Sequence, residues 1–161
     1  MEESSRSQYH RVSIKYSVIC ATLGLAMALL LVFQIFGARG IGDMVASKEF
    51  QASTIIALVT LYAAAIILGK VAGGLIHRVG VHGPRVWIIG VALAWSCLIF
   101  AVIIGSSINF FTEIYREPSV ADAFMDWIFK PTFWVLLFGG LPALGLGLLY
   151  AAGMRKSLGG R

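Results

Sequence analysis

Charged residues are scarce in this sequence. Asp, Glu, Lys and Arg make up only 13 % of the 161 residues, whereas hydrophobic residues make up 58 %. A soluble domain carries about 25 % charged residues. Because so few charges cannot cover a water-facing surface, most of the chain must face lipid. The net charge of +5 would suggest nucleic acid in a soluble chain, but here the positions of the charges matter more, and we predict no nucleic-acid partner.

Cysteine and histidine are too few for several kinds of site. The two cysteines form no C-x-x-C pair. Helical rise separates Cys20 and Cys97 by roughly 10 Å in depth, which is too far for a disulfide. His10, His77 and His82 lie near the ends of apolar runs, where they cannot ligate a haem at depth. His77 and His82 alone fall short of the three or four ligands of a zinc site. We therefore predict no metal, no cofactor and no catalytic residues.

Four long apolar runs dominate what the sequence does contain. They cover approximately residues 17–36, 52–76, 86–108 and 132–152, and each reaches the ~20 residues that cross a bilayer as a helix. Strands of a membrane barrel would instead alternate apolar and polar residues. The sequence predicts an all-α integral membrane protein in which residues 1–161 form one domain of four transmembrane helices. The first run is too long for a signal peptide, so we expect it to be retained.

Basic residues predict the orientation of these helices. The two tails and the middle loop hold nine Lys and Arg, whereas the other two loops hold four. Cytoplasmic loops carry the excess of Lys and Arg. We therefore predict a multi-pass protein of the bacterial cytoplasmic membrane with both termini in the cytoplasm. Six of the eight acidic residues fall in the two outer loops, which agrees with this orientation.

The segment GKVAGGLIHRVGVHGPR, residues 69–85, has the glycines and basic residues of a binding loop. It lacks the glycine spacing and the Lys-Ser/Thr pair of a Walker phosphate loop. We interpret residues 69–76 as the end of the second helix and the rest as a short cytoplasmic turn. Pro84 suits the first turn of the third helix, where its missing N–H costs nothing.

Lys70 is the one ionisable residue in the interior of an apolar run. Ion pathways and proton relays need such groups at depth, so the absence of others disfavours them. Lys70 lies roughly 10 Å from the cytoplasmic end of its helix, and its long side chain can reach the headgroups by snorkelling. The alternative is that Lys70, with Arg78 and Arg85, contacts an anionic lipid headgroup or a partner.

Small residues recur at every fourth position in each apolar run. The stripes are Cys20, Gly24 and Ala28; Ala65, Gly69 and Gly73; Cys97, Ala101 and Gly105; and Gly139, Ala143, Gly147 and Ala151. Close backbone contact at small residues drives helix association in lipid. These stripes predict a tightly packed bundle or packing against a partner. Pro142 predicts a kink in the fourth helix, as a packing accommodation or as part of a ligand path.

The second outer loop is predicted to hold a short amphipathic helix over about residues 119–129. Ser119 and Asp122 resemble a capping box at its start. Phe124 and Trp127 share one helix face, whereas the acidic residues share another. We expect this helix to lie on the outer membrane surface with Phe124 and Trp127 as interfacial anchors.

Together these features favour a non-catalytic accessory or assembly subunit of a larger membrane complex, which acts through helix packing. The expected partners are the lipid bilayer and other membrane subunits or a second copy. The alternative is a small transport component, for example a small permease subunit, or a self-assembling channel. A lipid-modifying enzyme is a third hypothesis, for which the sequence offers no nucleophile with a base.

Overall fold

The computed structural model describes residues 2–46, 48–114 and 119–159, and all regular structure in these ranges is helical. The elements are α1 (Glu2–Ala46), α2 (Lys48–Val79), α3 (Arg85–Glu113), α4 (Val120–Phe124), the π-helical turn η1 (Met125–Phe129) and α5 (Lys130–Leu158). Within the described ranges, four helical stretches are long and apolar enough to cross a membrane: Arg6–Gln34, Thr54–Val79, Arg85–Thr112 and Val120–Leu158. The prediction of an all-α chain with four such helices is confirmed.

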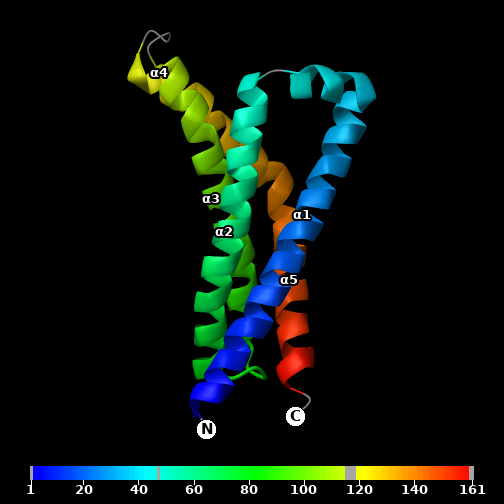
Figure 1. The fold of residues 1–161 in the computed structure, drawn as a ribbon, viewed down its shortest axis with the longest axis vertical. Helices are drawn as coiled ribbons and strands as arrows, with labels where there is room; N and C mark the ends of the chain where they lie inside the picture. The colour runs from blue at the N-terminus through cyan, green and yellow to red at the C-terminus, as the bar shows by residue number, and fades with distance from the viewer. Residues whose placement is uncertain (1, 47, 115–118, 160–161) are drawn as a thin grey trace.

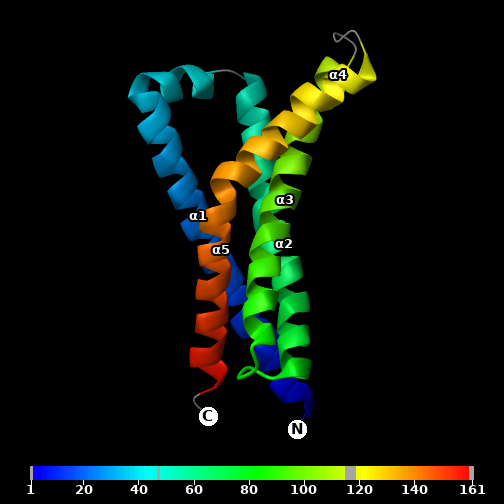
Figure 2. The same ribbon diagram turned by 180° about the vertical axis from the view of Figure 1, so that it is seen from behind.

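The helices form an elongated bundle with both termini at one end, which we call the terminus end (Figures 1 and 2). In the bundle α1 packs on α2, α2 on α3, α3 on α5, and α5 on α1. Toward the opposite end, which we call the far end, α1 diverges from α3 and α5 in both views. The helix axes are therefore closer together at the terminus end than at the far end.

The helix predicted over residues 119–129 is present, but it is not a separate element. Ser119 caps it, because its hydroxyl accepts a hydrogen bond from the Asp122 N–H at 3.1 Å and donates one to the Asp122 carboxylate at 2.6 Å. The helix then continues through η1 into α5 without a break. The fourth long helix therefore begins at Val120, about three turns before the predicted start. An interfacial position for its first turns stays a prediction.

The turn between α2 and α3 is shorter than the sequence indicates, because α2 continues to Val79 rather than ending at residue 76. Gly80 ends the helix with a positive φ of +79°, which glycine adopts without steric cost. Its N–H donates to the Ile76 carbonyl oxygen at 2.9 Å, as in a left-handed helix cap. His77 and Arg78 consequently lie in the last turn of α2, where positive charge interacts favourably with the helix dipole.

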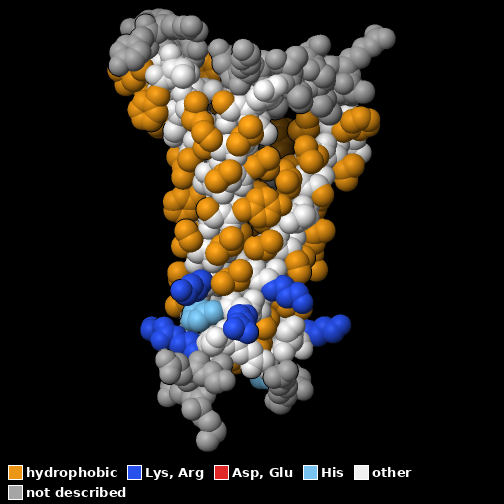
Figure 3. Space-filling model, viewed as in Figure 1, with side chains coloured by type: hydrophobic (Ala, Val, Ile, Leu, Met, Phe, Trp, Pro, Cys, Tyr) orange, Lys and Arg blue, Asp and Glu red, His pale blue; other side chains and the backbone are white. Residues whose placement is uncertain are grey.

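Apolar and basic side chains are separated on the face of the bundle that Figure 3 shows. Large apolar side chains cover most of the face in Figure 3, whereas Lys, Arg and His side chains gather near the terminus end. The largest fully buried side chains are Tyr150, Ile76, Met154, Val86 and Ser13. An apolar exterior around a small buried core is the expected arrangement for a bundle in lipid, where burial of apolar surface supplies little drive for association.

Candidate functional site

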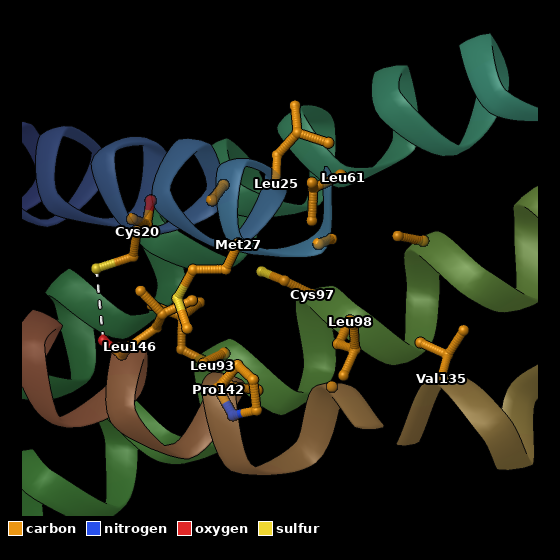
Figure 4. A pocket seen from close by; sticks show the side chains of 18 of the residues that line it. Cys20, Leu25, Met27, Leu61, Leu93, Cys97, Leu98, Val135, Pro142 and Leu146 are labelled. Atoms are coloured by element: carbon orange, nitrogen blue, oxygen red, sulfur yellow. Dashed lines mark hydrogen bonds between the residues drawn. The ribbon is translucent and has the colours of Figure 1, made fainter. Parts of the chain in front are cut away.

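An apolar cavity of about 310 Å³ lies between α1, α3 and α5 (Figure 4). Cys97 and Leu98 of α3 line it, and Pro142 and Leu146 line it from α5. Leu61 is the contribution of α2. The volume falls at the lower end of the ~300–1,000 Å³ range of small-molecule sites. Among the described residues, no Asp, Glu, Lys, Arg or His side chain lines the cavity, so its chemistry suits an apolar occupant.

Small side chains from three helices form much of the cavity wall. They are Cys20, Ala21, Gly24 and Ala28 on α1, Gly90, Ala94, Cys97 and Ala101 on α3, and Gly139 and Ala143 on α5. The predicted stripes of the first, third and fourth helices therefore meet at one cavity. Periodicity marks the face of each helix that carries small residues. It does not reveal that three such faces enclose a common space.

Gly147 and Ala151 continue the α5 stripe toward the terminus end, where it packs on α3. A Cβ atom placed on Gly147 would lie 2.6 Å from the Val91 Cα and 2.8 Å from the Gly90 carbonyl oxygen. Ala151 is fully buried, and a Cβ atom placed on Gly90 would lie 3.3 Å from the Ala151 Cβ. The helix that docks on this stripe is thus α3 of the same chain.

Ala65, Gly69 and Gly73 pack α2 against α1. All three are buried, and a Cβ atom placed on Gly73 would lie 2.9 Å from the Ser13 Cβ and 3.0 Å from the Tyr9 carbonyl oxygen. The stripe therefore lets the two antiparallel helices approach at backbone distance. It forms a second intramolecular contact and lies outside the cavity wall.

A buried polar cluster joins α1, α2 and α5 beside this contact. The Ser13 hydroxyl donates to the Gly69 carbonyl oxygen, so the hydrogen bond between the Ser13 and Tyr150 hydroxyls is donated by Tyr150. The Ser17 hydroxyl donates to the Ala65 carbonyl oxygen at 2.6 Å. This cluster was not predicted from the sequence. The available signal was that Ser13 and Ser17 extend the four-residue spacing of small residues on α1 toward the N-terminus.

Both cysteines are free and buried, and both line the cavity. The Cys20 thiol donates to the Leu146 carbonyl oxygen, with a sulfur–oxygen distance of 3.4 Å (Figure 4). Among the residues that the structure describes, no three His, Cys, Asp or Glu side chains gather into a group able to hold a metal ion.

The three basic residues predicted to contact a lipid headgroup or a partner do not all lie together. Lys70 and Arg78 lie on α2 and line a groove of about 360 Å³ with Arg6 and His10 of α1. We call this the basic groove. Arg85 is exposed at the first residue of α3 and does not line it. Arg6 and His10 were not predicted as site residues. They line the groove because α1 extends back to Glu2 as a helix.

The predicted anchors Phe124 and Trp127 differ in their surroundings. Phe124 is 48 % exposed, as an anchor requires. Trp127 is half-buried, and its indole N–H is buried without an acceptor among the described residues. The π-helical turn at 125–129 changes the helical spacing here, so the face expected from a regular α-helix is not kept.

Comparisons of this chain with protein-family models, curated proteins and solved structures gave no match.

Proposed function

We propose that the protein is a non-catalytic accessory subunit of a larger membrane complex and that a transmembrane helix of a partner subunit seats against the cavity. The observation that carries this proposal is that small-residue faces of α1, α3 and α5 surround an apolar space that no side chain of the described residues fills. Small residues allow backbones to approach closely, which drives helix association in lipid. A large apolar side chain of the partner can then fill the cavity.

The exposure of α1 supports an added helix. Leu29, Leu30 and Phe33 are 60 %, 63 % and 54 % exposed. Successive helical residues point about 100° apart, so exposure of Leu29 and Leu30 together means that neighbouring helices leave a wide sector of α1 uncovered. Closer to the terminus end, Ser13 and Ser17 of the same helix are buried. α1 thus packs against neighbouring helices around Ser13 and Ser17 and has room for another helix around residues 29–33.

A second candidate function is a small transport component or self-assembling channel that handles an apolar molecule. Pro142 favours it, because this residue lies inside α5 and in the cavity wall. Proline removes a backbone hydrogen bond and allows a helix to bend. Figure 2 shows that the two halves of α5 run in different directions. An uncharged wall fits an apolar cargo better than an ion.

Filling the cavity is expected to distinguish these functions. Ala94→Leu adds a bulky side chain to the cavity wall, whereas Ala92→Leu makes the same change at an exposed position on the same helix. Overpacking of a close contact costs about 1–3 kcal/mol, which corresponds to roughly a 5- to 150-fold weaker association. We expect Ala94→Leu to reduce the recovery of partner subunits after purification in mild detergent and Ala92→Leu to leave it unchanged.

Native mass spectrometry of the same preparations identifies the occupant. Partner subunits that are retained by wild type and lost from Ala94→Leu support the accessory subunit. A bound apolar molecule that disappears in Ala94→Leu, with no partner chain in either preparation, supports transport instead. Equal partner recovery from both variants and wild type contradicts docking at the cavity.

The topology proposed is a multi-pass arrangement with both termini in the cytoplasm of a bacterial cell. On the face in Figure 3, the Lys and Arg side chains of the described residues gather near the terminus end, which supports this topology because cytoplasmic ends carry the excess of these residues. A reporter fused after Arg161 is expected to be active in the cytoplasm, and one inserted at Ser119 to be active outside. Reporters that respond on the same side of the membrane would contradict four membrane crossings.

A further inference from the structure

The basic groove is built by two antiparallel helices whose residues face each other at four-residue spacing. Arg6 and His10 are four apart on α1, and Lys70, Gly74 and Arg78 are each four apart on α2. Residues at this spacing lie on one helix face. The groove therefore has two rows of positively charged or ionisable side chains, with a glycine at the centre of one row.

His10 is held in place over that glycine. Its Nδ1 lies 2.8 Å from the Lys70 carbonyl oxygen. A carbonyl oxygen only accepts hydrogen bonds, so Nδ1 donates and the ring orientation is set. A Cβ atom placed on Gly74 would lie 3.3 Å from the His10 Cε1, so the imidazole rests against the glycine backbone. A larger residue at position 74 would push the ring out of place.

The three cations of the groove line one pocket. Arg6, Lys70 and Arg78 are exposed, and none forms a salt bridge with a carboxylate among the described residues. Like charges that share a site repel one another, and a bound anion relieves this repulsion. A phosphate group accepts charge-assisted hydrogen bonds from guanidinium and ammonium groups, which are stronger than neutral ones.

The groove also has an apolar side that continues along α2. Val71 and Leu75 line it and are 55 % and 44 % exposed. Ile67 is four residues before Val71 and 63 % exposed, so these three side chains form one exposed row leading from the groove into the membrane-spanning part of α2. A free phosphate ion would use only the cations, whereas a phospholipid would use the cations and the apolar row.

We propose that the basic groove binds an anionic phospholipid, with its phosphate between Arg6, Lys70 and Arg78 and an acyl chain along Ile67, Val71 and Leu75. Basic pockets between transmembrane helices recognise such headgroups through charge. This site is separate from the cavity and does not depend on the proposed accessory function. His10 lines the groove beside Gly74.

The test measures lipid selectivity of the full chain reconstituted in phosphatidylcholine vesicles with spin-labelled lipids. Wild type is expected to restrict the motion of phosphatidylglycerol in preference to phosphatidylcholine. Arg6→Gln/Lys70→Gln/Arg78→Gln should lower this preference by at least about fivefold, the effect of roughly one cation near an anionic lipid. The control Arg11→Gln/Arg85→Gln/Lys156→Gln removes the same charges from exposed positions outside the groove and should keep the preference.

A charge-neutral variant separates the groove from general surface charge. A Cβ atom placed on Gly74 has only the His10 ring within 4 Å, and Gly74→Leu is expected to reduce the preference without changing net charge or the stability of the protein in detergent. The proposal is overturned if wild type shows no preference, or if both triple variants lose it equally. It is also overturned if inorganic phosphate abolishes the preference and Val71→Ser/Leu75→Ser retains it in full, because the site would then bind a free anion.

Discussion

Gly147→Leu is expected to separate α5 from α3 and to destabilise the protein by about 3 kcal/mol or more. Overpacking commonly costs about 1–3 kcal/mol when side chains can move aside. At Gly147 the obstructing atoms are backbone atoms of Gly90 and Val91, at 2.6–2.8 Å from an added Cβ. These atoms cannot rotate away, so the helices themselves must part. The expected result is a lower thermal midpoint in mild detergent and loss of the monodisperse form.

Gly145→Leu is the matched control for this prediction. Gly145 lies on the same helix two residues earlier, is exposed, and has no atom within 4 Å of an added Cβ. Its replacement should leave the thermal midpoint close to that of wild type. Leu146 cannot serve as a lipid-facing control, because it is 9 % exposed and lines the cavity. Equal midpoints for Gly147→Leu and Gly145→Leu would contradict the backbone contact between α3 and α5.

Tyr150→Ala is expected to have the second large effect, a loss of about 3 kcal/mol. Truncation of a buried aromatic side chain costs about 3–5 kcal/mol, because the surrounding structure closes only part of the space. Tyr150 is 1 % exposed, and its ring carbon Cδ1 would lie 3.2 Å from a Cβ atom placed on Gly90. The residue also lines the apolar cavity, so its loss enlarges an existing space. The change in thermal midpoint in mild detergent measures the effect.

A double-mutant cycle separates the hydroxyl of Tyr150 from its ring. Tyr150→Phe keeps the ring and should cost about 1 kcal/mol, the value of one hydrogen bond. Ser13→Ala should cost more, about 1–3 kcal/mol, because it leaves the buried Tyr150 hydroxyl without its Ser13 partner. The double variant should be less destabilised than the sum of the single variants. Additive effects would contradict coupling between these side chains.

Small residues have different surroundings at the terminus end of the bundle and farther along it. At the terminus end, Gly73 and Gly147 bring backbones into contact within the chain. Farther along, Ala28 and Ala101 line a cavity that no described side chain fills. Small residues in the first group have their helix partner in this molecule. Those in the second group are available to a partner subunit or an apolar ligand, which is the basis of the proposed function.

Local features of the fold were predictable from the amino-acid sequence. A run such as residues 86–108 has to be helical in lipid, because only a helix satisfies its backbone hydrogen bonds within one segment. Two helix starts were also predictable. Ser119 and Asp122 resemble a capping box, and Pro84 suits the first turn of a helix. The small-residue stripes followed from the helical period alone. Each of these properties depends on neighbours a few residues away.

The extent of the helices was harder to predict, because apolar runs mark the lipid-facing length and not the helical length. Helix α2 continues through His77 and Arg78 to a cap at Gly80, and α1 begins at Glu2 although the first apolar run begins near residue 17. Polar residues can extend a helix beyond the bilayer at little cost, since water or headgroups form hydrogen bonds with their side chains. This extension places Arg6 and His10 beside α2 and completes the basic groove.

Which stripe faces which neighbour was decided only by the tertiary structure. The sequence determined that Gly147 lies on a face of small residues. Docking of a partner helix and docking of α3 of the same chain would both require small residues on that face, so the sequence could not distinguish them. The Ser13–Tyr150 hydrogen bond joins residues 137 positions apart, and the cavity joins three helices. Helical period specifies the directions of side chains around one axis. The rotation, crossing and separation of several axes are set by all their contacts together, which is why these two features emerge only from the packed bundle.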